Sequence, residues 1–513
     1  MSRQWIAILD YGSQYTQLIA RRIREQQVYS EIIRFDTTAA KLRENPPAGI
    51  ILSGGPNSVF EEGAPGIDAE IFNLGIPVLG VCYGMQLMSQ TLGGKVTPGE
   101  SREYGKTEMT TTPDNVLFAG LPQSFVVWMS HGDRVAEIPD GFQVSATSAN
   151  CPYAAIRDER RKFYAIQFHP EVVHTEFGNQ IIGNFLFKVC GCKADWKLSS
   201  WIDETVEKIK RQVGDEEVVL GLSGGVDSSV VAVLLHKAIG PRLHCIFVDN
   251  GLLRYNEDKQ VEEMFHAKLG LDLYVAHAAS HFYAALKGVS DPEQKRKIIG
   301  REFINVFADC ARKYKRCKFL GQGTIYPDVI ESSHALKGPS QTIKSHHNVG
   351  GLPPDLKFEL VEPLRDLFKD EVRAVGRVLG MDSELLDRQP FPGPGLGVRI
   401  LGEVTEEKVR LLQQADLRVQ EEVRKLPDYK TIWQTFAVLL PVKSVGVMGD
   451  QRTYEYTCAI RSVNSIDAMT ADWTHLPYET LATMSNRIIN EVRGINRVVY
   501  DISSKPPATI EWE

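Results

Sequence analysis

The chain has 513 residues, a net charge of −7, and 43% hydrophobic and 24% charged residues. This length exceeds what one hydrophobic core supports, so we expect two to four domains. The acidic balance, without a block of lysine or arginine, argues against a nucleic-acid partner. Because no apolar run approaches about 18 residues and the N-terminus enters a strand at once, we expect no membrane span, no signal peptide and a cytoplasmic location.

Apolar runs predict the fold class in chain order. Over residues 5–190, WIAIL, AGIILSGG, PVLGVC and FYAIQF alternate with helical stretches or turns, which predicts a doubly wound, mostly parallel α/β sheet. After a helix expected over 202–213, VVLGLSGG, LHCIFVDNG, LDLYVAH and CKFLGQG predict a second doubly wound sheet. The Pro- and Gly-rich stretch RQPFPGPGLG then begins a smaller α+β region. We expect domains at 1–192, 193–388 and 389–513.

The eight cysteines include no Cys-x-x-Cys pair, which is typical of reduced thiols in a reducing compartment. Cys190 and Cys192 lie close in the sequence, but no second pair of soft ligands lies near them to complete a zinc site. We expect both of these cysteines to be structural.

The first region contains a nucleophile motif. In GVCYGMQ, Gly80 and Gly84 bracket Cys82 as in the strand-to-helix elbow of Gly-x-Ser-x-Gly. A thiol at a helix N-terminus is favoured as the thiolate, and the next backbone N–H can serve an oxyanion hole. A buried, inert cysteine is the alternative, which the glycine bracket disfavours. His169 and Glu171, at the end of an alternating strand, can point to one face and supply a base and its orienting group.

These three side chains resemble the Cys-His-Glu triad of the class I glutamine amidotransferases, in which the cysteine attacks the glutamine amide and releases ammonia. LSGGP (52–56) resembles the second oxyanion element of that family, which implies Gly55 and the Tyr83 N–H as donors. MSHGD (129–133) resembles the segment that helps to bind glutamine. The resemblance implies glutamine contacts from Gln86, Ser130 and His131.

The second region contains a phosphate-loop pattern, SGGVDSS (223–229), between an apolar strand and an apolar helix. Free N–H groups and the positive end of a helix dipole suit an anion there. The Walker lysine is missing, and the carboxylate of Asp227 suggests Mg²⁺ beside the phosphates. A Gly-rich loop without a ligand is the alternative. The pattern resembles the ATP pyrophosphatases, and the resemblance implies an ATP site of Ser223, Gly224, Gly225, Val226, Asp227, Ser228, Ser229, Val248 and Gly321.

A long polar loop over 332–352 contains Lys344, His346 and His347. Such a loop can close over a phosphate-bearing substrate, and a disordered surface loop is the alternative. Asp328 and Glu331 are carboxylates suited to a metal or substrate, or to the first turn of a helix.

The order of these motifs, followed by LLPVKSVGVMGDQRTYEY and DISSKPPATIEWE, closely resembles the GMP synthase family over essentially the whole chain. The resemblance implies amination of xanthosine 5′-monophosphate (XMP) with ammonia from glutamine, while ATP is cleaved to AMP and pyrophosphate through an adenylated intermediate. It also implies Mg²⁺ with the ATP and a homodimer formed through the C-terminal domain. The implied XMP contacts are Arg296, Lys344, Lys505 and Glu511.

The C-terminal region raises two further points. The family stretch Arg-His-Pro-Phe-Pro-Gly-Pro-Gly has histidine where this chain has Gln389, so the resemblance assigns no role to this residue. In the tail, Ile510 and Trp512 alternate with polar neighbours, which predicts a paired strand.

Three other classes of protein are alternatives. An NAD synthetase also joins an ATP pyrophosphatase to a glutaminase, but that glutaminase is of the nitrilase type and has no Gly-x-Cys-x-Gly elbow. A thiolating tRNA enzyme would need a basic surface or sulfur-handling cysteines. A non-catalytic interaction protein would be expected to have lost Cys82, His169 or Asp227, and all three are present.

Overall fold

The computed structural model describes residues 4–334, 355–448, 451–465 and 470–513. The chain forms two compact units, Met1–Lys197 and Leu198–Glu513. The sequence predictions for Lys344, His346 and His347 fall outside the described residues. Within the described ranges, no helix is both long enough and apolar enough to cross a bilayer.

A nine-stranded sheet forms the first unit, in the order β2-β1-β3-β4-β9-β8-β7-β5-β6. Its first five strands are parallel, and four of them, β1, β3, β4 and β9, are the predicted apolar runs, whereas β2 was not predicted. β1, β3, β4 and β9 are buried along their whole length, as parallel strands covered on both faces are. The parallel strands are β1 (Trp5–Asp10), β2 (Tyr29–Arg34), β3 (Gly49–Leu52), β4 (Val78–Val81) and β9 (Phe163–Ile166), and the α-helices are α1 (Thr16–Glu25), α2 (Ala39–Glu44), α3 (Tyr83–Thr91) and α4 (Gly178–Gly183).

The other strands of this sheet are antiparallel, and the sequence analysis did not predict them. β6 alternates buried with half-buried or exposed residues over most of its length, so it has no continuous apolar run to mark it. The segment MSHGD lies on this strand. The antiparallel strands are β5 (Lys95–Thr111), β6 (Ser124–Glu137), β7 (Gln143–Ser148) and β8 (Ala155–Asp158).

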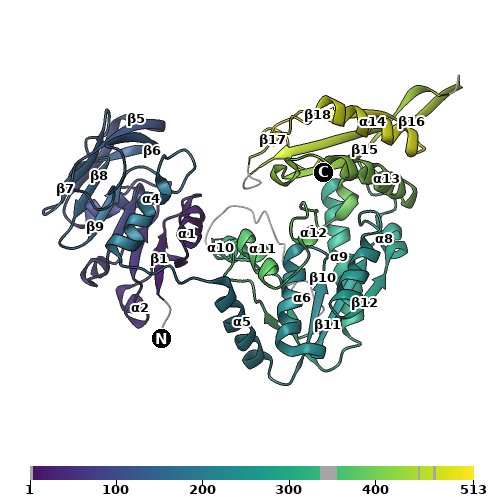
Figure 1. Cartoon of the computed structure of the whole chain (residues 1–513), viewed down its shortest axis with the longest axis horizontal. Coiled ribbons are helices and arrows are strands. Elements are labelled where there is room, and N and C mark those ends of the chain that lie inside the picture. The colour runs from purple at the N-terminus through teal and green to yellow at the C-terminus, as the bar shows by residue number, and fades with distance from the viewer. Residues whose placement is uncertain (1–3, 335–354, 449–450, 466–469) are drawn as a thin grey trace. The chain divides into compact units, whose positions relative to one another are not determined.

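The second unit contains the second predicted parallel sheet, in the order β12-β11-β10-β13-β14. Figure 1 shows α6 and α9 on opposite sides of β10 and β11, which is the doubly wound arrangement. The strands are β10 (Glu217–Leu222), β11 (Leu243–Asp249), β12 (Asp272–His277), β13 (Cys317–Gly321) and β14 (Glu359–Val361). The helices are α5 (Leu198–Val213), α6 (Val226–Ile239), α7 (Glu257–Glu262), α8 (Ala279–Leu286), α9 (Pro292–Ala311), α10 (Tyr326–His334), α11 (Lys369–Val378) and α12 (Ser383–Leu386).

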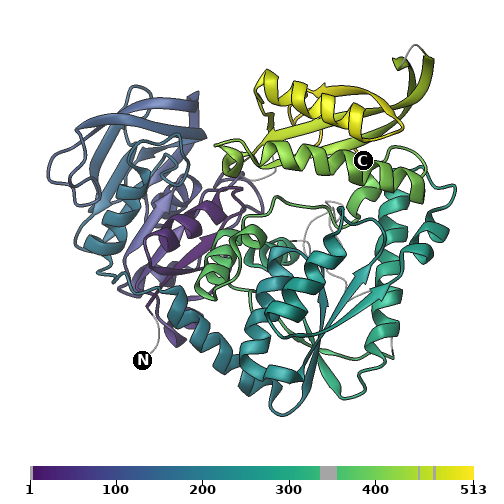
Figure 2. The ribbon, with the colours of Figure 1, turned by 45° about the vertical axis from the view of Figure 1, so that its right-hand side comes forward.

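A smaller α+β region completes the second unit (Figure 2). Strands β15 (Gln434–Met448), β16 (Gln451–Asn464) and β17 (Asp472–Trp473) are antiparallel, and β18 (Ile495–Asp501) runs parallel to β16. Helices α13 (Glu406–Val423) and α14 (Tyr478–Glu491) pack against this sheet and each other. One cluster of buried side chains extends from Ile246 in the parallel sheet through Leu396 to Ile460. The second unit therefore shares a core between its two sheets.

The tail after β18 does not form the paired strand that the alternation of Ile510 and Trp512 predicted. Its strand-like pairing in the described residues is a single bridge between Lys505 and Ala471. Instead, the fully buried Arg461 donates from its guanidinium to the Thr509 carbonyl at 3.0 Å and to the Ile510 carbonyl at 3.4 Å. A side chain thus satisfies backbone groups that a neighbouring strand would otherwise bind.

Candidate active sites

Cys82 lies in the turn between β4 and α3, with φ 51° and ψ −107°. This conformation is strained for a residue with a side chain. A Cβ added at Gly84 would lie 2.3 Å from the Leu52 carbonyl oxygen, and one at Gly80 would lie 2.7 Å from the Gly84 oxygen. Both glycines are therefore required for the close approach of backbone that makes the elbow.

His169 and Glu171 contact each other and the elbow. His169 Nδ1 lies 2.7 Å from Glu171 Oε1, and the side chains are 4% and 0% exposed. Burial by itself lowers the pKa of His169, but the Glu171 carboxylate and a hydrogen bond with Cys82 raise this pKa well above its ordinary value. The fold thus brings the three predicted residues together and favours a protonated imidazole beside the Cys82 sulfur.

The LSGGP loop packs directly against the elbow. The Gly84 N–H donates to the Ser53 carbonyl at 3.0 Å. A Cβ added at Gly55 would lie 2.8 Å from the Tyr11 carbonyl oxygen and 3.2 Å from the Tyr83 ring. The predicted oxyanion donors, Gly55 and the Tyr83 N–H, therefore come from two segments in contact.

Gln86 lies on α3 and Ser130 lies on β6. The Gln86 side-chain amide donates to the Asp133 carbonyl at 3.0 Å. The Ser130 carbonyl oxygen lies 3.7 Å from Cys82 Sγ. Gln86 is 3% exposed, so its side chain fixes the segment 130–133 beside the thiol.

His131 is enclosed by protein atoms. Its Nδ1 lies 2.9 Å from the Asp133 carbonyl oxygen, and its Nε2 lies 3.2 Å from Glu103 Oε2. Burial lowers the pKa of His131, against the opposing effect of Glu103. The imidazole therefore links β5 to β6, on which Glu103 and His131 lie opposite each other, and the sequence offered no signal that Glu103, 28 residues earlier, would be its partner.

Two groups of side chains in the described part of the chain have the donor types and the closeness that a metal ion needs. Burial raises the pKa of the Cys151 thiol to about 12, with a further contribution from Glu103, so the cysteine of the first group is protonated. Neither group includes Asp227, the predicted magnesium ligand. The groups are Glu103, His131 and Cys151, and Glu217, His244 and Cys317.

The SGGVDSS turn connects β10 to α6, as predicted. Gly224 has φ 72°, a conformation that favours glycine. The hydroxyl oxygens of Ser223 and Ser228 are 2.9 Å apart, whereas the fully buried Ser229 donates to the Gly225 carbonyl at 2.6 Å. Ser229 thus builds the turn, and the other two hydroxyls lie at its surface.

A cavity of about 320 Å³ lies over this turn, at the carboxyl ends of the parallel strands. Residues 223–228 and Val248 line it, so most of the predicted ATP residues surround one space. In the described part of the chain, Ser229 and Gly321 are not among its lining residues. A Cβ at Gly321 would lie 2.7 Å from Leu235, so this glycine lets β13 approach α6.

The sequence motifs did not predict the cationic side chains of this cavity, two of which lie on α11. Lys369 and Arg373, on α11, line it together with Asp227. Lys369 Nζ lies 2.5 Å from Asp227 Oδ2, while Asp227 Oδ1 and Arg373 Nε are buried without a hydrogen-bond partner. The spacing of four residues, which puts Lys369 and Arg373 on one helix face, was the available signal.

The predicted XMP residues in the described ranges lie in or beside the C-terminal tail. Arg296 donates to the Glu513 carbonyl. The Glu511 carboxylate accepts two hydrogen bonds from Arg399, at 2.9 and 3.0 Å. Lys505 pairs with Ala471 through its backbone.

Comparison with known proteins gives matches along the whole chain. The model of the class-I glutamine amidotransferases matches residues 7–189, that of NAD synthase matches 197–303, and that of the GMP synthase C-terminal domain matches 421–512. A GMP synthase [glutamine-hydrolyzing] of Brachyspira hyodysenteriae is 58% identical over 508 residues, which is 99% of each chain. Its counterpart in Geobacillus kaustophilus is 57% identical over 513 residues, which is 100% of each chain.

The chain belongs to the GMP synthase family. Membership makes it a ligase with a glutamine amidotransferase region, as the motifs predicted. The NAD synthase match covers part of the second unit, whereas the GMP synthases match from end to end. The NAD synthetase alternative is therefore not favoured.

Proposed function

We propose that this chain converts XMP to GMP, with glutamine as the nitrogen donor and with ATP cleaved to AMP and pyrophosphate. The end-to-end similarity to GMP synthases carries the choice of XMP as acceptor, because both active-site motifs recur in enzymes with other acceptors. The geometry supports the two half-reactions, one in each compact unit.

In the first unit, Cys82 is the nucleophile that attacks the side-chain amide of glutamine. His169 holds the proton of the thiol and passes it to the departing ammonia, and Glu171 orients the imidazole and raises its pKa through the 2.7 Å contact. The N–H groups of Gly55 and Tyr83 donate to the oxyanion of the tetrahedral intermediate. Water then cleaves the thioester and releases glutamate. Gln86, Ser130 and His131 shape the glutamine site by fixing the strand beside the thiol.

In the second unit, the turn at 223–228 binds the ATP phosphates, and Val248 lies near the adenosine. Lys369 and Arg373 supply positive charge to the departing pyrophosphate from across the cavity. The buried, unpartnered Asp227 Oδ1 fits a magnesium ligand, and bound Mg²⁺ would neutralise phosphate charge. Ser229 and Gly321 support the site by shaping the turn and the strand behind it.

The XMP site is proposed at the C-terminal tail, with Arg296, Lys344, Lys505 and Glu511 as contacts. We further propose domains at 1–192, 193–388 and 389–513 and a homodimer through the last of them. Exposed apolar side chains on β15 and β16 support this contact, namely Val442, Val445, Val447 and Tyr454. The eight free cysteines support a reducing, cytoplasmic location.

A product assay tests the function. The purified chain is supplied with ATP, Mg²⁺, glutamine and XMP, and we expect GMP, AMP and pyrophosphate in equal amounts. A parallel reaction contains deamido-NAD in place of XMP. Formation of NAD, or ATP cleavage to ADP and phosphate, would contradict the proposal.

A further inference from the structure

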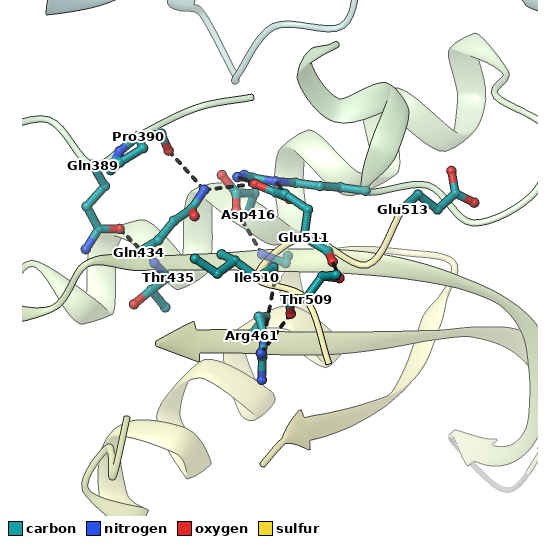
Figure 3. A network of polar contacts seen from close by, with 12 residues as sticks. Gln389, Pro390, Asp416, Gln434, Thr435, Arg461, Thr509, Ile510, Glu511 and Glu513 are labelled. Carbon is teal, nitrogen blue, oxygen red and sulfur yellow. Dashed lines mark hydrogen bonds and ion pairs between the residues drawn. The ribbon is translucent and has the colours of Figure 1, made fainter. Parts of the chain in front are cut away.

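Gln389 is buried in the second unit with an exposed fraction of 8%. Its side-chain oxygen accepts from the Thr435 N–H at 2.8 Å, as Figure 3 shows. Its side-chain amide donates to the Ile432 carbonyl at 3.4 Å. The carboxamide therefore binds one donor and one acceptor of the backbone on either side of the start of β15.

Gln434, the residue before Thr435, connects the same segment to the tail. Its side-chain amide donates to the Pro390 carbonyl at 3.0 Å and to Glu511 Oε1 at 2.9 Å (Figure 3). Gln434 is 4% exposed, so water cannot replace these bonds freely. The position of β15 thus sets the position of the Glu511 carboxylate.

The other partner of Glu511 also touches this segment. Arg399, 1% exposed, lies with its guanidinium carbon 3.9 Å from the centre of the Phe436 ring and 5.1 Å from that of Phe391. Phe391 lines the cavity above the phosphate turn, as Gln389 does. Segment 389–391 therefore contacts the ATP cavity on one side and the support of Glu511 on the other.

We propose that Gln389 is a positioning residue that holds segment 389–391 and the Glu511 carboxylate in fixed relation, and so aligns the ATP and XMP sites. This inference rests on the proposed function of the second unit. Without the carboxamide, the Thr435 N–H and the Ile432 carbonyl would be buried without partners, and the start of β15 would shift. Gln434 and Glu511 would shift with it.

The chemistry of the carboxamide also predicts what a histidine would do at this position. A neutral imidazole has one acceptor and one donor, so it can make the same two bonds, but an imidazolium cannot accept from the Thr435 N–H. Glutamine keeps both bonds at every pH. The ionisable groups packed around this segment are Arg254, Arg399, Asp416 and Glu511.

Steady-state kinetics of the full chain test the proposal, with ammonium salts as the nitrogen source so that the first unit is not involved. We expect Gln389→Ala to raise the KM for XMP about tenfold and to change the KM for ATP by less than about twofold. The matched control is Gln420→Ala. Gln420 lies on α13 and its side-chain amide also donates to Thr435, at 2.5 Å from the carbonyl oxygen, but it does not contact segment 389–391 through this bond. Equal effects of the two substitutions on the KM for XMP would overturn the proposal.

A second variant separates positioning from folding. Gln389→His is expected to stay within about twofold of wild type at pH 8, and its KM for XMP relative to wild type is expected to rise below about pH 6.5 as the imidazole is protonated. If the ratio of the two KM values for XMP, variant over wild type, does not change with pH, the two hydrogen bonds of residue 389 do not position the XMP site.

A double-mutant cycle tests the route through Gln434. If Gln389 acts through Gln434, the combined Gln389→Ala and Gln434→Ala substitutions should raise the KM for XMP by less than the product of the single effects. A rise in the KM for XMP in the double variant equal to the product of the two single effects would exclude this route. Wild-type chain that makes no GMP from XMP would refute the proposed function itself, whereas a working wild type with an unaffected Gln389→Ala variant would refute only the positioning role.

Discussion

The two candidate sites differ in how their reactive groups are paired. In the first unit, His169 contacts both Cys82 and Glu171, and these contacts raise its pKa, although Glu171 Oε2 is buried without a hydrogen-bond partner. In the second unit, Asp227 Oδ1 and Arg373 Nε are buried beside a cavity without a partner. Covalent catalysis needs a nucleophile prepared before the substrate arrives, whereas phosphate chemistry needs charges that the substrate and its metal ion complete.

Removal of the nucleophile is expected to have the largest effect. We expect Cys82→Ala to lower glutamine-dependent GMP synthesis about 10⁴-fold or more, because no other group in this site can form the thioester. Synthesis from ammonium salts should remain within about twofold of wild type, since the thiol serves only ammonia production. Measurement of GMP with both nitrogen sources checks this. Equal loss with both sources would contradict a division of labour between the units.

Neutralisation of the orienting carboxylate should lower the activity of the first site. Glu171→Gln keeps the shape but removes the charge that raises the pKa of His169, so glutaminase activity should fall about 100-fold or more. The folded-state pKa of His169 lies above its unfolded value of about 6.5, so the stabilisation from its proton is complete below that pH and is lost as the pH rises through the folded pKa. Because the proton on His169 is also needed for catalysis and its pKa is lower in the variant, kcat/KM of the variant should fall at a lower alkaline pH than that of wild type. An unchanged alkaline limb in a pH profile would argue against this role.

Removal of the carboxylate beside the cavity should test the second site. Asp227→Asn is expected to lower GMP synthesis about 100-fold from either nitrogen source, because it removes a charge that would hold Mg²⁺ at the phosphates. Isotope exchange between pyrophosphate and ATP measures the adenylation step directly. Glu262→Gln, at an exposed carboxylate on α7, is the control and should behave as wild type. Exchange at the wild-type rate in the Asp227 variant would show that this residue has no role in the release of pyrophosphate.

A single methyl group should distort the elbow without touching its chemistry. A Cβ at Gly84 would lie 2.3 Å from the Leu52 carbonyl oxygen, so Gly84→Ala is expected to destabilise the first unit by about 2 kcal/mol or more. The midpoint and enthalpy of the thermal unfolding transition of the first unit, measured by calorimetry of the full chain, check the prediction. The matched control is Gly66→Ala, because an added Cβ at Gly66 meets nothing within 4 Å.

The sequence predicted the features that depend on consecutive residues. The buried strands of both parallel sheets appear as apolar runs because both faces of each strand are covered. The elbow around Cys82 and the turn at 223–228 were visible because a tight turn needs glycine at fixed positions next to the functional side chain.

Only the tertiary structure decided which distant side chains meet. Lys369 lies 142 residues from Asp227 in the chain, and Arg399 lies 112 residues from Glu511, yet each pair is in contact. The antiparallel strands of the first unit and the irregular tail held by Arg461 also escaped the patterns. The physical reason is that a charge or an amide gives no periodic signal of its own. Its partner is chosen by how sheets and helices pack, and that packing depends on the whole buried surface rather than on any short segment.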